Sequence, residues 1–221
     1  MNMLAPPRAR LTIEVIIDLV CPWCYLGVAR LLRTLRQRPG VAFDIRWRPF
    51  LLNPDMPRTG IPRGDYLARK FGSAERADRL HGTIMALGRE EGIEFRFHRI
   101  VQAPSSLNAH RLIALAARHG VAQRVVQVLF AAHFSDGLNI GEAQCLLRIA
   151  SDAGLPAIAV RAMLATEEGA EQVRAENLDA HRSGVNGVPC FILGQRHAIA
   201  GAQEAEVFER LIDVALTEDA D

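Results

Sequence analysis

An apolar segment that ends at two closely spaced cysteines constrains the fold of this 221-residue chain more than any other feature. Residues 11–20 are rich in isoleucine, valine and leucine, a composition typical of a buried strand. From Cys24 to Leu35 the apolar residues recur with a helical period, as in a helix that packs on a sheet. Cys21 and Cys24 therefore mark a junction at which a strand is followed directly by a helix.

The sequence Cys21-Pro22-Trp23-Cys24 places two thiols at the start of the predicted helix. Unpaired N–H groups and the helix dipole at this end favour a thiolate at Cys21 over a thiol. Pro22 suits the first helical position, where no N–H donor is needed. Three residues make almost one helical turn, so Cys24 lies within reach of Cys21. We predict a redox-active dithiol, in which Pro22 and Trp23 set the reduction potential and contact the substrate; partial packing of Trp23 is the alternative.

The composition excludes several classes of function. A net charge of +1 predicts no attraction to nucleic acid or to an anionic membrane. Residues 11–20 are too few to span a bilayer. Residues 1–10 lack the apolar stretch of a secretory signal, which favours a cytoplasmic protein. Lys70 is the only lysine in the chain, which we interpret as coding bias.

A Cys-x-x-Cys pair in the cytoplasm is usually catalytic or metal-binding, because thiols stay mostly reduced there. A structural zinc site needs two further ligands at paired spacing. Cys145 and Cys190 are single and far apart in the sequence, so we predict no bound metal. Cys145 lies on an apolar helical face and is expected to be a small buried hydrophobe. Cys190 is interpreted either as a packed strand residue or as a third redox thiol near the pair.

The segments around the dithiol predict a βαβ unit, and those near the C-terminus a ββα unit. Residues 41–49 alternate weakly, as a second strand does, and a right-handed crossover makes this strand parallel to the first. Residues 187–193 and 197–200 have strand character, and an amphipathic helix follows. Together they predict an α/β fold with a thioredoxin-like core and a large all-α insertion between the two units.

The insertion is expected to consist of helices. One begins at Ser73, and another begins at Ser105 or Ser106. Residues 95–98 are predicted to be a short extended piece.

A Pro/Gly-rich passage at residues 49–64 supports a boundary before the helical block. We divide the chain into a thioredoxin-like core, residues 1–62 and 184–221, and a helical insertion domain, residues 63–183. The two ends of such an insertion should lie close in space.

Val188-Pro189 is the candidate for a substrate-docking loop beside the dithiol. Two glycines within residues 184–187 let the backbone turn freely. A cis X–Pro bond costs only about 0.5–1 kcal/mol relative to trans. It would aim the Val188 backbone at a bound chain, which could pair with it as a strand. An ordinary trans proline at a strand start is the alternative.

Residues 18–27 read Asp-Leu-Val-Cys-Pro-Trp-Cys-Tyr-Leu-Gly, and residues 184–189 read Gly-Val-Asn-Gly-Val-Pro. Both stretches resemble signatures of the DsbA-like thioredoxin family, most closely its FrnE-type branch, which includes the 2-hydroxychromene-2-carboxylate isomerases. Residues 106–112 resemble a segment of that branch's helical domain, and residues 201–203 resemble its turn into the last helix. The resemblance covers nearly the whole chain in matching order.

The resemblance implies thiol–disulfide exchange on a thioredoxin core with a helical insert. It makes Cys21 the exposed nucleophile, Cys24 the more buried resolving thiol and Pro189 a cis-proline that faces them. The isomerase branch generally has serine at the position of Cys21 and uses glutathione. Cysteine at both positions therefore favours redox chemistry.

Several further residues are candidates for tuning the dithiol. Asp18 either tunes the thiols or passes protons, or it caps a loop. Asn108 and His110 either face the dithiol from the insertion, as the resemblance suggests, or pack at its interface. Cys190 joins this group as the third thiol considered above.

We therefore expect a thiol–disulfide oxidoreductase that acts on protein or small-molecule disulfides. It holds no bound cofactor in this interpretation, and glutathione is a candidate co-substrate. The alternatives are a glutathione-dependent isomerase or transferase acting on an aromatic metabolite, and a non-catalytic, chaperone-like binding module.

Overall fold

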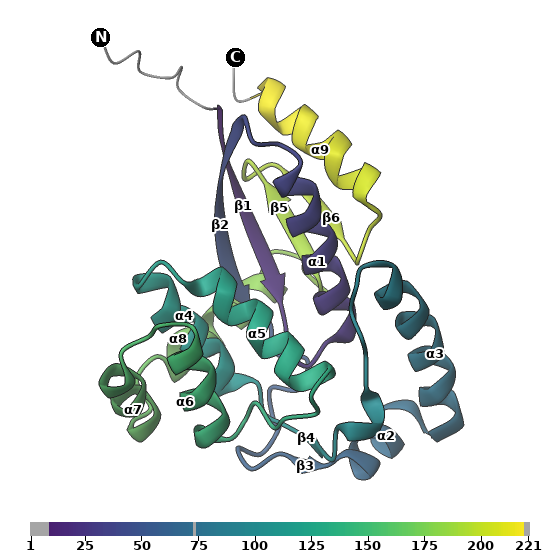
Figure 1. Ribbon diagram of the computed structural model, residues 1–221, viewed down its shortest axis with the longest axis vertical. Coiled ribbons are helices and arrows are strands. Elements are labelled where there is room, and N and C mark those ends of the chain that lie inside the picture. The colour runs from purple at the N-terminus through teal and green to yellow at the C-terminus, as the bar shows by residue number, and fades with distance from the viewer. Residues whose placement is uncertain (1–8, 73, 219–221) are drawn as a thin grey trace.

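The structure is a computed structural model that describes residues 9–72 and 74–218 (Figure 1). Its strands are β1 (Ala9–Ile17), β2 (Val41–Pro49), β3 (Ile61–Pro62), β4 (Gln102–Ala103), β5 (Cys190–Leu193) and β6 (His197–Ala200). Its helices are α1 (Pro22–Arg36), α2 (Arg63–Phe71), α3 (Ala74–Glu90), α4 (Leu107–Arg118), α5 (Ala122–Phe134), α6 (Ala143–Asp152), α7 (Ala157–Ala165), α8 (Ala170–Arg182) and α9 (Ala205–Glu218). No helix in the described ranges has the length and hydropathy that crossing a membrane requires.

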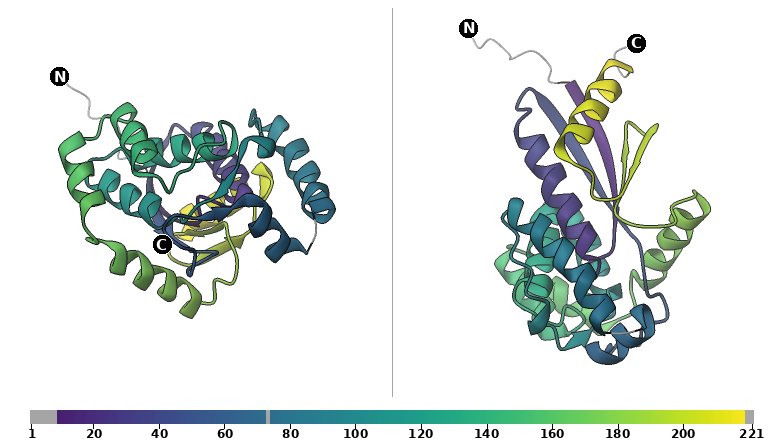
Figure 2. Two further views of the ribbon diagram at one scale, coloured as in Figure 1. Left: turned by 90° about the horizontal axis from the view of Figure 1, so that it is seen from below. Right: turned by 90° about the vertical axis from the view of Figure 1, so that its right-hand side faces the viewer.

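The central sheet has the strand order β2-β1-β5-β6. β1 pairs in parallel with β2, and α1 makes the crossover between them, as the sequence predicts. β5 pairs antiparallel with both β1 and β6. Helix α9 packs on α1, β1 and β5, whereas α8 lies on the opposite side of the sheet from α1 in the right-hand view of Figure 2. The predicted α/β fold with a thioredoxin-like core is confirmed.

Alternating side chains of β1 supply apolar groups to both faces of the sheet. Leu11, Ile13, Val15 and Ile17 are at most 1% exposed and belong to the main apolar core. Ile16 points the other way, into a smaller cluster to which α8 contributes. Coverage on both faces explains why β1 has a nearly continuous apolar sequence.

Strand β1 ends at Ile17, earlier than the sequence predicts, because Asp18 turns the chain out of the sheet. Its carboxylate accepts hydrogen bonds from the N–H groups of Val20 (3.3 Å) and Leu52 (2.8 Å). These bonds tie the loop after β1 to the loop after β2. Strand β5 likewise begins at Cys190, later than predicted. Both differences lie where the chain leaves the sheet to build the dithiol region.

The insertion is mostly helical, but one short element differs from its prediction. The extended piece expected at residues 95–98 is wrong: Phe97–Arg99 form one turn of 3-10 helix, closed by the Ile100 N–H on the Phe97 carbonyl at 3.2 Å. Strands β3 and β4 pair antiparallel, which the sequence analysis did not predict. Ser106 precedes α4 but makes no side-chain capping bond. Ser73, the expected cap of α3, lies outside the described residues.

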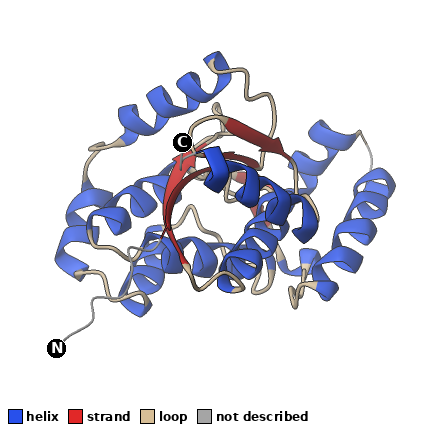
Figure 3. Ribbon diagram, turned by 90° about the horizontal axis from the view of Figure 1, so that it is seen from above, coloured by secondary structure: helices blue, strands red, loops and turns tan. Residues whose placement is uncertain are grey.

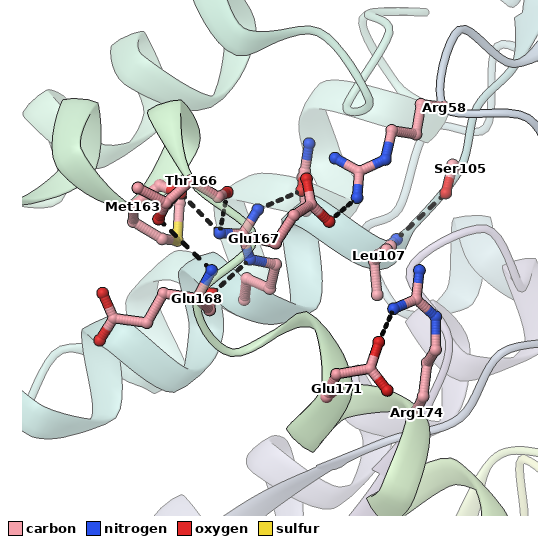
Figure 4. A network of polar contacts seen from close by, with 11 residues as sticks. Arg58, Ser105, Leu107, Met163, Thr166, Glu167, Glu168, Glu171 and Arg174 are labelled. Atoms are coloured by element: carbon pink, nitrogen blue, oxygen red, sulfur yellow. Dashed lines mark hydrogen bonds and ion pairs between the residues drawn. The ribbon is translucent and has the colours of Figure 1, made fainter.

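A buried arginine in the insertion organises the end of α7 and the turn before α8. Arg111 is 2% exposed, and its guanidinium donates to the carbonyls of Met163, Thr166 (2.7 Å) and Glu168 (2.8 Å) (Figure 4). One side chain thus binds three backbone carbonyls in the last turn of α7 and in the segment that follows it. A further bond, at 2.8 Å, goes to Oδ1 of Asn108 on the same helix.

The main apolar core runs without a break from the sheet into the insertion. Leu31 of α1, Ile84 of α3, Leu112 of α4 and Phe130 of α5 belong to one buried cluster. Seen from above, helices enclose the twisted sheet (Figure 3). The apolar packing is continuous across the predicted domain boundary. The division into residues 1–62 with 184–221 and residues 63–183 therefore stays a prediction.

Candidate active site

The two cysteines of the Cys-Pro-Trp-Cys sequence begin helix α1. Cys21 is the N-cap residue with an extended backbone, and Pro22 follows at the start of the helix. The Cys21 carbonyl accepts hydrogen bonds from the N–H groups of Cys24 (3.0 Å) and Tyr25 (3.3 Å). The first helical turn thus holds both cysteines in one fixed arrangement at the end of β1.

Both thiols are buried, Cys24 more completely than Cys21. Cys24 is 0% exposed and Cys21 is 5% exposed. This position of Cys21 differs from the exposed nucleophile that the resemblance implies. Cys21 lines a cavity whose other walls come from the insertion and from the Val188 loop.

The surroundings of the two thiols shift their pKa values in opposite directions. A hydrogen bond from the Cys24 thiol lowers the pKa of Cys21, against the opposing effects of burial and of the Asp18 charge. Burial raises the pKa of Cys24 well above its usual value, and the hydrogen bond to Cys21 raises it further. Cys21 is therefore the group that ionises first, and Cys24 keeps its proton.

The Val188–Pro189 loop lies directly against Cys21. The peptide bond between Val188 and Pro189 is cis. The Cys21 thiol donates to the Val188 carbonyl with a sulfur–oxygen distance of 3.6 Å. The Pro189 carbonyl accepts a hydrogen bond from the Gly201 N–H at 2.7 Å, which fixes the loop to the turn before α9. A molecule bound at Cys21 therefore meets the backbone of Val188.

Asp18 and His110 form a buried pair behind the dithiol. Their side chains are 0% and 3% exposed, and His110 Nε2 lies 3.7 Å from Asp18 Oδ1. His110 Nε2 has no hydrogen-bond partner among the described residues. The charge of Asp18 raises the pKa of both Cys21 and Cys24. His110 thus contacts Asp18, and Asp18 acts on the dithiol through its charge.

A cavity of about 340 Å³ opens beside Cys21. The core contributes Cys21, Pro22, Trp23 and Val188 to its wall, and the insertion contributes α2, α3 and the residues around Phe97. Most of the lining is apolar, and among the side chains that the structure describes no aspartate or glutamate lines the cavity. The volume lies at the lower end of the range, about 300–1,000 Å³, that small-molecule sites occupy.

Potential metal ligands do not cluster among the side chains that the structure describes. Within residues 9–72 and 74–218, no three His, Cys, Asp or Glu side chains are placed to hold a metal ion together.

A family model described as a DSBA-like thioredoxin domain matches residues 12–213. The chain belongs to this family. A probable DsbA oxidoreductase from Streptomyces coelicolor is 32% identical, with a TM-score of 0.85 over 94% of this chain and 91% of that one. At the level of the family, the activity is that of a thiol–disulfide oxidoreductase or isomerase.

Two more distant structures share the fold alone. A 2-hydroxychromene-2-carboxylate isomerase is 19% identical, with a TM-score of 0.72 over 95% of this chain and 98% of that one. The cytosolic disulfide reductase DsbM from Pseudomonas aeruginosa, in a structure with GSH, is 22% identical. Its TM-score is 0.65 over 93% of this chain and 99% of that one. The same fold thus occurs in an isomerase and in a disulfide reductase.

Two of the candidate tuning residues, Cys190 and Asn108, do not line the cavity beside the dithiol of this DsbA-like chain. Cys190 is 6% exposed and packs in the cluster on the other face of the sheet, with Ile16 and Ala180. Burial raises its pKa, so it stays a thiol. Asn108 does not line the cavity, and its side chain is held by Arg111. Cys145, expected to be buried, is only partly buried.

The sequence analysis missed the contribution of α2 to the DsbA-like site. Arg63, Tyr66, Leu67, Lys70 and Phe71 all line the cavity from this helix. Their spacing of three and four residues is the signal that could have revealed a common face. The occurrence of the only lysine on that face, which we interpreted as coding bias, is a second signal.

Proposed function

We propose that this chain is a thiol–disulfide oxidoreductase that exchanges disulfides through Cys21 and Cys24. The observation that carries the proposal is the placement of Cys21 in the wall of a cavity, with its sulfur 3.6 Å from the Val188 carbonyl and its pKa lowered by the Cys24 thiol. The buried Cys24 keeps its proton until it is needed. This asymmetry is what a nucleophile and a resolving thiol require.

The exchange follows from the state of each sulfur. The Cys21 thiolate attacks one sulfur of a substrate disulfide, the substrate S–S bond breaks, and one substrate thiolate leaves. Cys24 then loses its proton and attacks Cys21 of the mixed disulfide, which releases the second substrate thiolate. The substrate gains two electrons and the protein pair becomes a disulfide. The reverse sequence donates that disulfide to a dithiol.

The Val188–Pro189 loop supplies the docking contact in this proposal. The Val188 carbonyl faces Cys21 and loses the thiol donor when Cys21 ionises. A substrate N–H can then occupy this acceptor, as in strand-like pairing of a bound segment. Pro22 and Trp23 line the same cavity and contact the substrate from the side of α1.

We further propose glutathione as the co-substrate that returns the pair to the dithiol. Two molecules of glutathione reduce the Cys21–Cys24 disulfide and leave as one molecule of oxidised glutathione, so atoms and electrons balance. The DsbM structure with GSH supports a glutathione partner for this fold. The proposed compartment is the cytoplasm, where glutathione is plentiful and keeps thiols reduced.

The test is reversible disulfide formation between Cys21 and Cys24, measured in buffers of defined glutathione ratio by alkylation and mass spectrometry. We expect a two-electron titration, and turnover of the uncharged bis(2-hydroxyethyl) disulfide with glutathione. Cys21→Ser should abolish turnover and Cys24→Ser should trap a mixed disulfide at Cys21. Cys145→Ser is the control and should leave turnover intact. Turnover that survives Cys21→Ser would falsify the proposal.

A further inference from the structure

Helix α5 brings a buried histidine to the cavity beside Cys21. His133 is 3% exposed and lines this cavity together with its neighbour Phe134. The Nδ1 atom of His133 lies 3.2 Å from the Leu138 carbonyl. A carbonyl oxygen only accepts hydrogen bonds, so we assign the ring proton to Nδ1, which donates it. The other ring nitrogen, Nε2, then carries no proton as long as the imidazole is neutral.

The Nε2 atom of His133 is open to the cavity. The described residues offer it no hydrogen-bond partner, since the hydrogen bond of this ring goes to Leu138 through Nδ1. Packing does not seal it off either, because the described polar atoms that are buried without a partner are Gln102 Oε1 and His110 Nε2. The space that His133 borders is the cavity that Cys21 also lines. An occupant of this cavity therefore meets Nε2.

Burial keeps the imidazole of His133 neutral. It lowers the pKa of His133, because the imidazolium would lose its hydration. The charge of Arg63 acts in the same direction, whereas the hydrogen bond to Leu138 and the charge of Asp18 oppose the shift without reversing it. His133 thus presents a lone pair to the cavity and acts there as a hydrogen-bond acceptor.

Aromatic packing fixes the position of this acceptor relative to the dithiol. The ring of Tyr25, near the start of α1, lies 5.2 Å from the ring of Phe130 and 6.2 Å from that of Phe134, both in α5. The His133 ring meets the Phe134 ring edge-on at 4.7 Å. Helices α1 and α5 therefore hold Cys21 and His133 in one fixed arrangement.

The surroundings of Nε2 make this acceptor selective. The cavity measures about 340 Å³, which suits one small molecule, and Leu67, Ile84 and Phe134 are among its apolar lining. An apolar group of an occupant would leave Nε2 unpaired, whereas an O–H or N–H group of the same shape would pair with it. A site with such an acceptor discriminates strongly against analogues that lack the donor.

Resting on the proposed function, we propose that the disulfide substrate is small and largely apolar and carries an uncharged O–H or N–H donor, which His133 selects by accepting its hydrogen bond at Nε2. The Cys21 thiolate attacks the near sulfur, the substrate S–S bond breaks and the far thiolate leaves. Cys24 then attacks the Cys21 sulfur and the second thiolate leaves. The substrate gains two electrons, one of its thiolates takes up the Cys24 proton, and His133 keeps its proton on Nδ1.

The test compares two aromatic disulfides of similar size. Bis(4-hydroxyphenyl) disulfide carries the donor, and bis(4-methylphenyl) disulfide has a methyl group in its place. The second-order rate constant of the reduced protein is measured with each reagent, and the rate of Cys21→Ser is subtracted to remove the other cysteines. The ratio of the two constants is then divided by the same ratio for dithiothreitol, which removes the intrinsic reactivity. For the wild type we expect a corrected preference for the hydroxyl reagent of about tenfold.

His133→Asn should abolish this preference. Its amide can still donate to Leu138 but is too short to place an acceptor where Nε2 lies. His133→Gln, whose longer side chain brings an amide to that place, should restore part of the preference. His119→Asn is the matched control, because His119 is exposed at the end of α4 and does not line the cavity. Equal slowing of both reagents by His133→Asn would overturn the inference, because His133 would then have a structural role only.

A second pair of reagents identifies the kind of donor. N,N′-Diacetylcystamine has an amide N–H where bis(2-acetoxyethyl) disulfide has an ester oxygen. A preference for the amide that His133→Asn removes assigns an N–H donor, and a preference confined to the phenol assigns a hydroxyl. No corrected preference in either pair, with reaction still at Cys21, would overturn the inference while the dithiol chemistry stands. Wild-type rates in Cys21→Ser would instead defeat the proposed function.

A readout independent of rate uses the nitrogen itself. In Cys24→Ser, Cys21 is converted to a mixed disulfide with 4-hydroxythiophenol or with 4-methylthiophenol, and the ¹⁵N resonances of the histidine rings are recorded, with His133→Asn to assign the signal. We expect the Nε2 resonance of His133 to shift in the hydroxyl adduct alone. The same Nε2 resonance in both adducts would contradict a hydrogen bond to the donor.

Discussion

A hydrogen bond from the Cys24 thiol has the largest effect on the pKa of Cys21. The Cys24 thiol is the largest cause that lowers the pKa of Cys21, whereas burial and the charge of Asp18 raise it. A hydrogen bond to a charged group is worth about 1.5–3 kcal/mol, and a tenfold change in ionisation is about 1.4 kcal/mol. The thiol at position 24 is therefore the largest of the contacts that favour the thiolate of Cys21, and hydrogen bonds from the backbone of Cys24 and Trp23 add to its effect.

The first prediction follows from removing that donor. In Cys24→Ala we expect the pKa of Cys21 to rise and its alkylation by iodoacetamide near neutral pH to slow about tenfold. In Cys24→Ser the hydroxyl still donates, so alkylation should stay fast. The measurement is the rate of carbamidomethylation of the Cys21 peptide against pH. Identical pH profiles for the two variants would show that the hydrogen bond does not set the pKa.

His133 provides a second titrating group at the cavity wall. It is 3% exposed, and its Nδ1 lies 3.2 Å from the Leu138 carbonyl, to which it donates. Burial lowers its pKa from 6.5 to about 4. The folded protein therefore holds His133 neutral over a range of pH in which the unfolded chain protonates it. Its contribution to stability is complete above pH 6.5 and is lost as the pH falls toward about 4.

The second prediction is a pH-dependent loss of stability. The gap between 6.5 and about 4 sets an upper limit of about 3 kcal/mol on this effect. We expect His133→Asn, whose amide can donate to Leu138, to be less stable near neutral pH but to lose less stability on acidification. Urea unfolding of both proteins at several pH values measures the difference. Parallel curves for wild type and variant would assign the acid sensitivity to other groups.

Part of the site could be predicted from the local sequence, whereas the rest depends on tertiary contacts between distant segments. The placement of Cys21, Pro22 and Cys24 follows from a junction within a few residues, so sequence reasoning could describe it. The burial of Cys21 depends on segments far away in the chain, which a local pattern does not contain. Lys70 belongs to the cavity only because α2 packs against α3 and the β3–β4 pair, so its periodic spacing alone did not identify a site.

At the level of elements, Gly27 lets α1 approach the Val188–Pro189 loop. A Cβ atom there would lie 2.9 Å from Pro189 Cγ and 3.1 Å from Phe191 Cζ. Both neighbours are buried, so neither can give way easily. The glycine in the middle of α1 therefore sets the distance between the dithiol helix and the docking loop.

The third prediction concerns this close approach. Gly27→Ala should lower the free energy of unfolding by about 1–3 kcal/mol, the usual cost of overpacking, despite the better helix propensity of alanine. Gly40→Ala is the control, because a Cβ at Gly40 meets nothing within 4 Å. That control should change stability by less than about 0.5 kcal/mol. Equal effects of the two substitutions in urea unfolding would rule out a packing role for Gly27.

Arg30 joins three elements through charge. Its side chain is 2% exposed and contacts Glu91 after α3 at 3.1 Å and Glu204 before α9 at 2.9 Å. It also donates to the Ala202 carbonyl at 2.9 Å. Arg33 reaches the same Glu91 oxygen at 2.9 Å, but its side chain is 44% exposed. The buried partner therefore carries the larger share of the contact.

The fourth prediction separates these two arginines. Arg30→Met leaves the side chain of Glu91, 4% exposed, with only an exposed partner. It should cost about 3 kcal/mol of unfolding free energy. Arg33→Met should cost less than about 1 kcal/mol. Denaturant midpoints for the two variants make the comparison, and a larger loss in Arg33→Met would contradict it.

Element types were predictable where a period extends over several turns, and boundaries were not. The helix after Cys21 shows a strong periodic pattern, the parallel strand after it shows a weak alternation, and both are present. The end of β1 depends on the side-chain bonds of Asp18 to a distant loop, which no period reveals. The aromatic residues around Phe97 alternate as in a strand. The ring of Phe97 packs on Phe95 and Phe134, and the backbone there forms one turn of 3-10 helix.

For the whole molecule, the question is whether the core and the insertion fold as one unit. The predicted insertion, residues 63–183, shares one continuous apolar cluster with the sheet and α1. Strand β3, just before the predicted boundary, pairs with β4 inside the insertion. A chain whose parts share a core should unfold cooperatively, because neither part keeps its buried surface without the other.

The last prediction uses the positions of the two tryptophans. Trp23 and Trp47 both belong to the predicted core, so their fluorescence reports on the core. Most helical residues belong to the insertion, so the far-ultraviolet circular dichroism reports mainly on the insertion. In urea, we expect the two signals to change together with one midpoint and one slope. Loss of circular dichroism before fluorescence would mean that the insertion unfolds alone. The cavity beside Cys21 would then open without unfolding of the core, because the insertion supplies much of its wall.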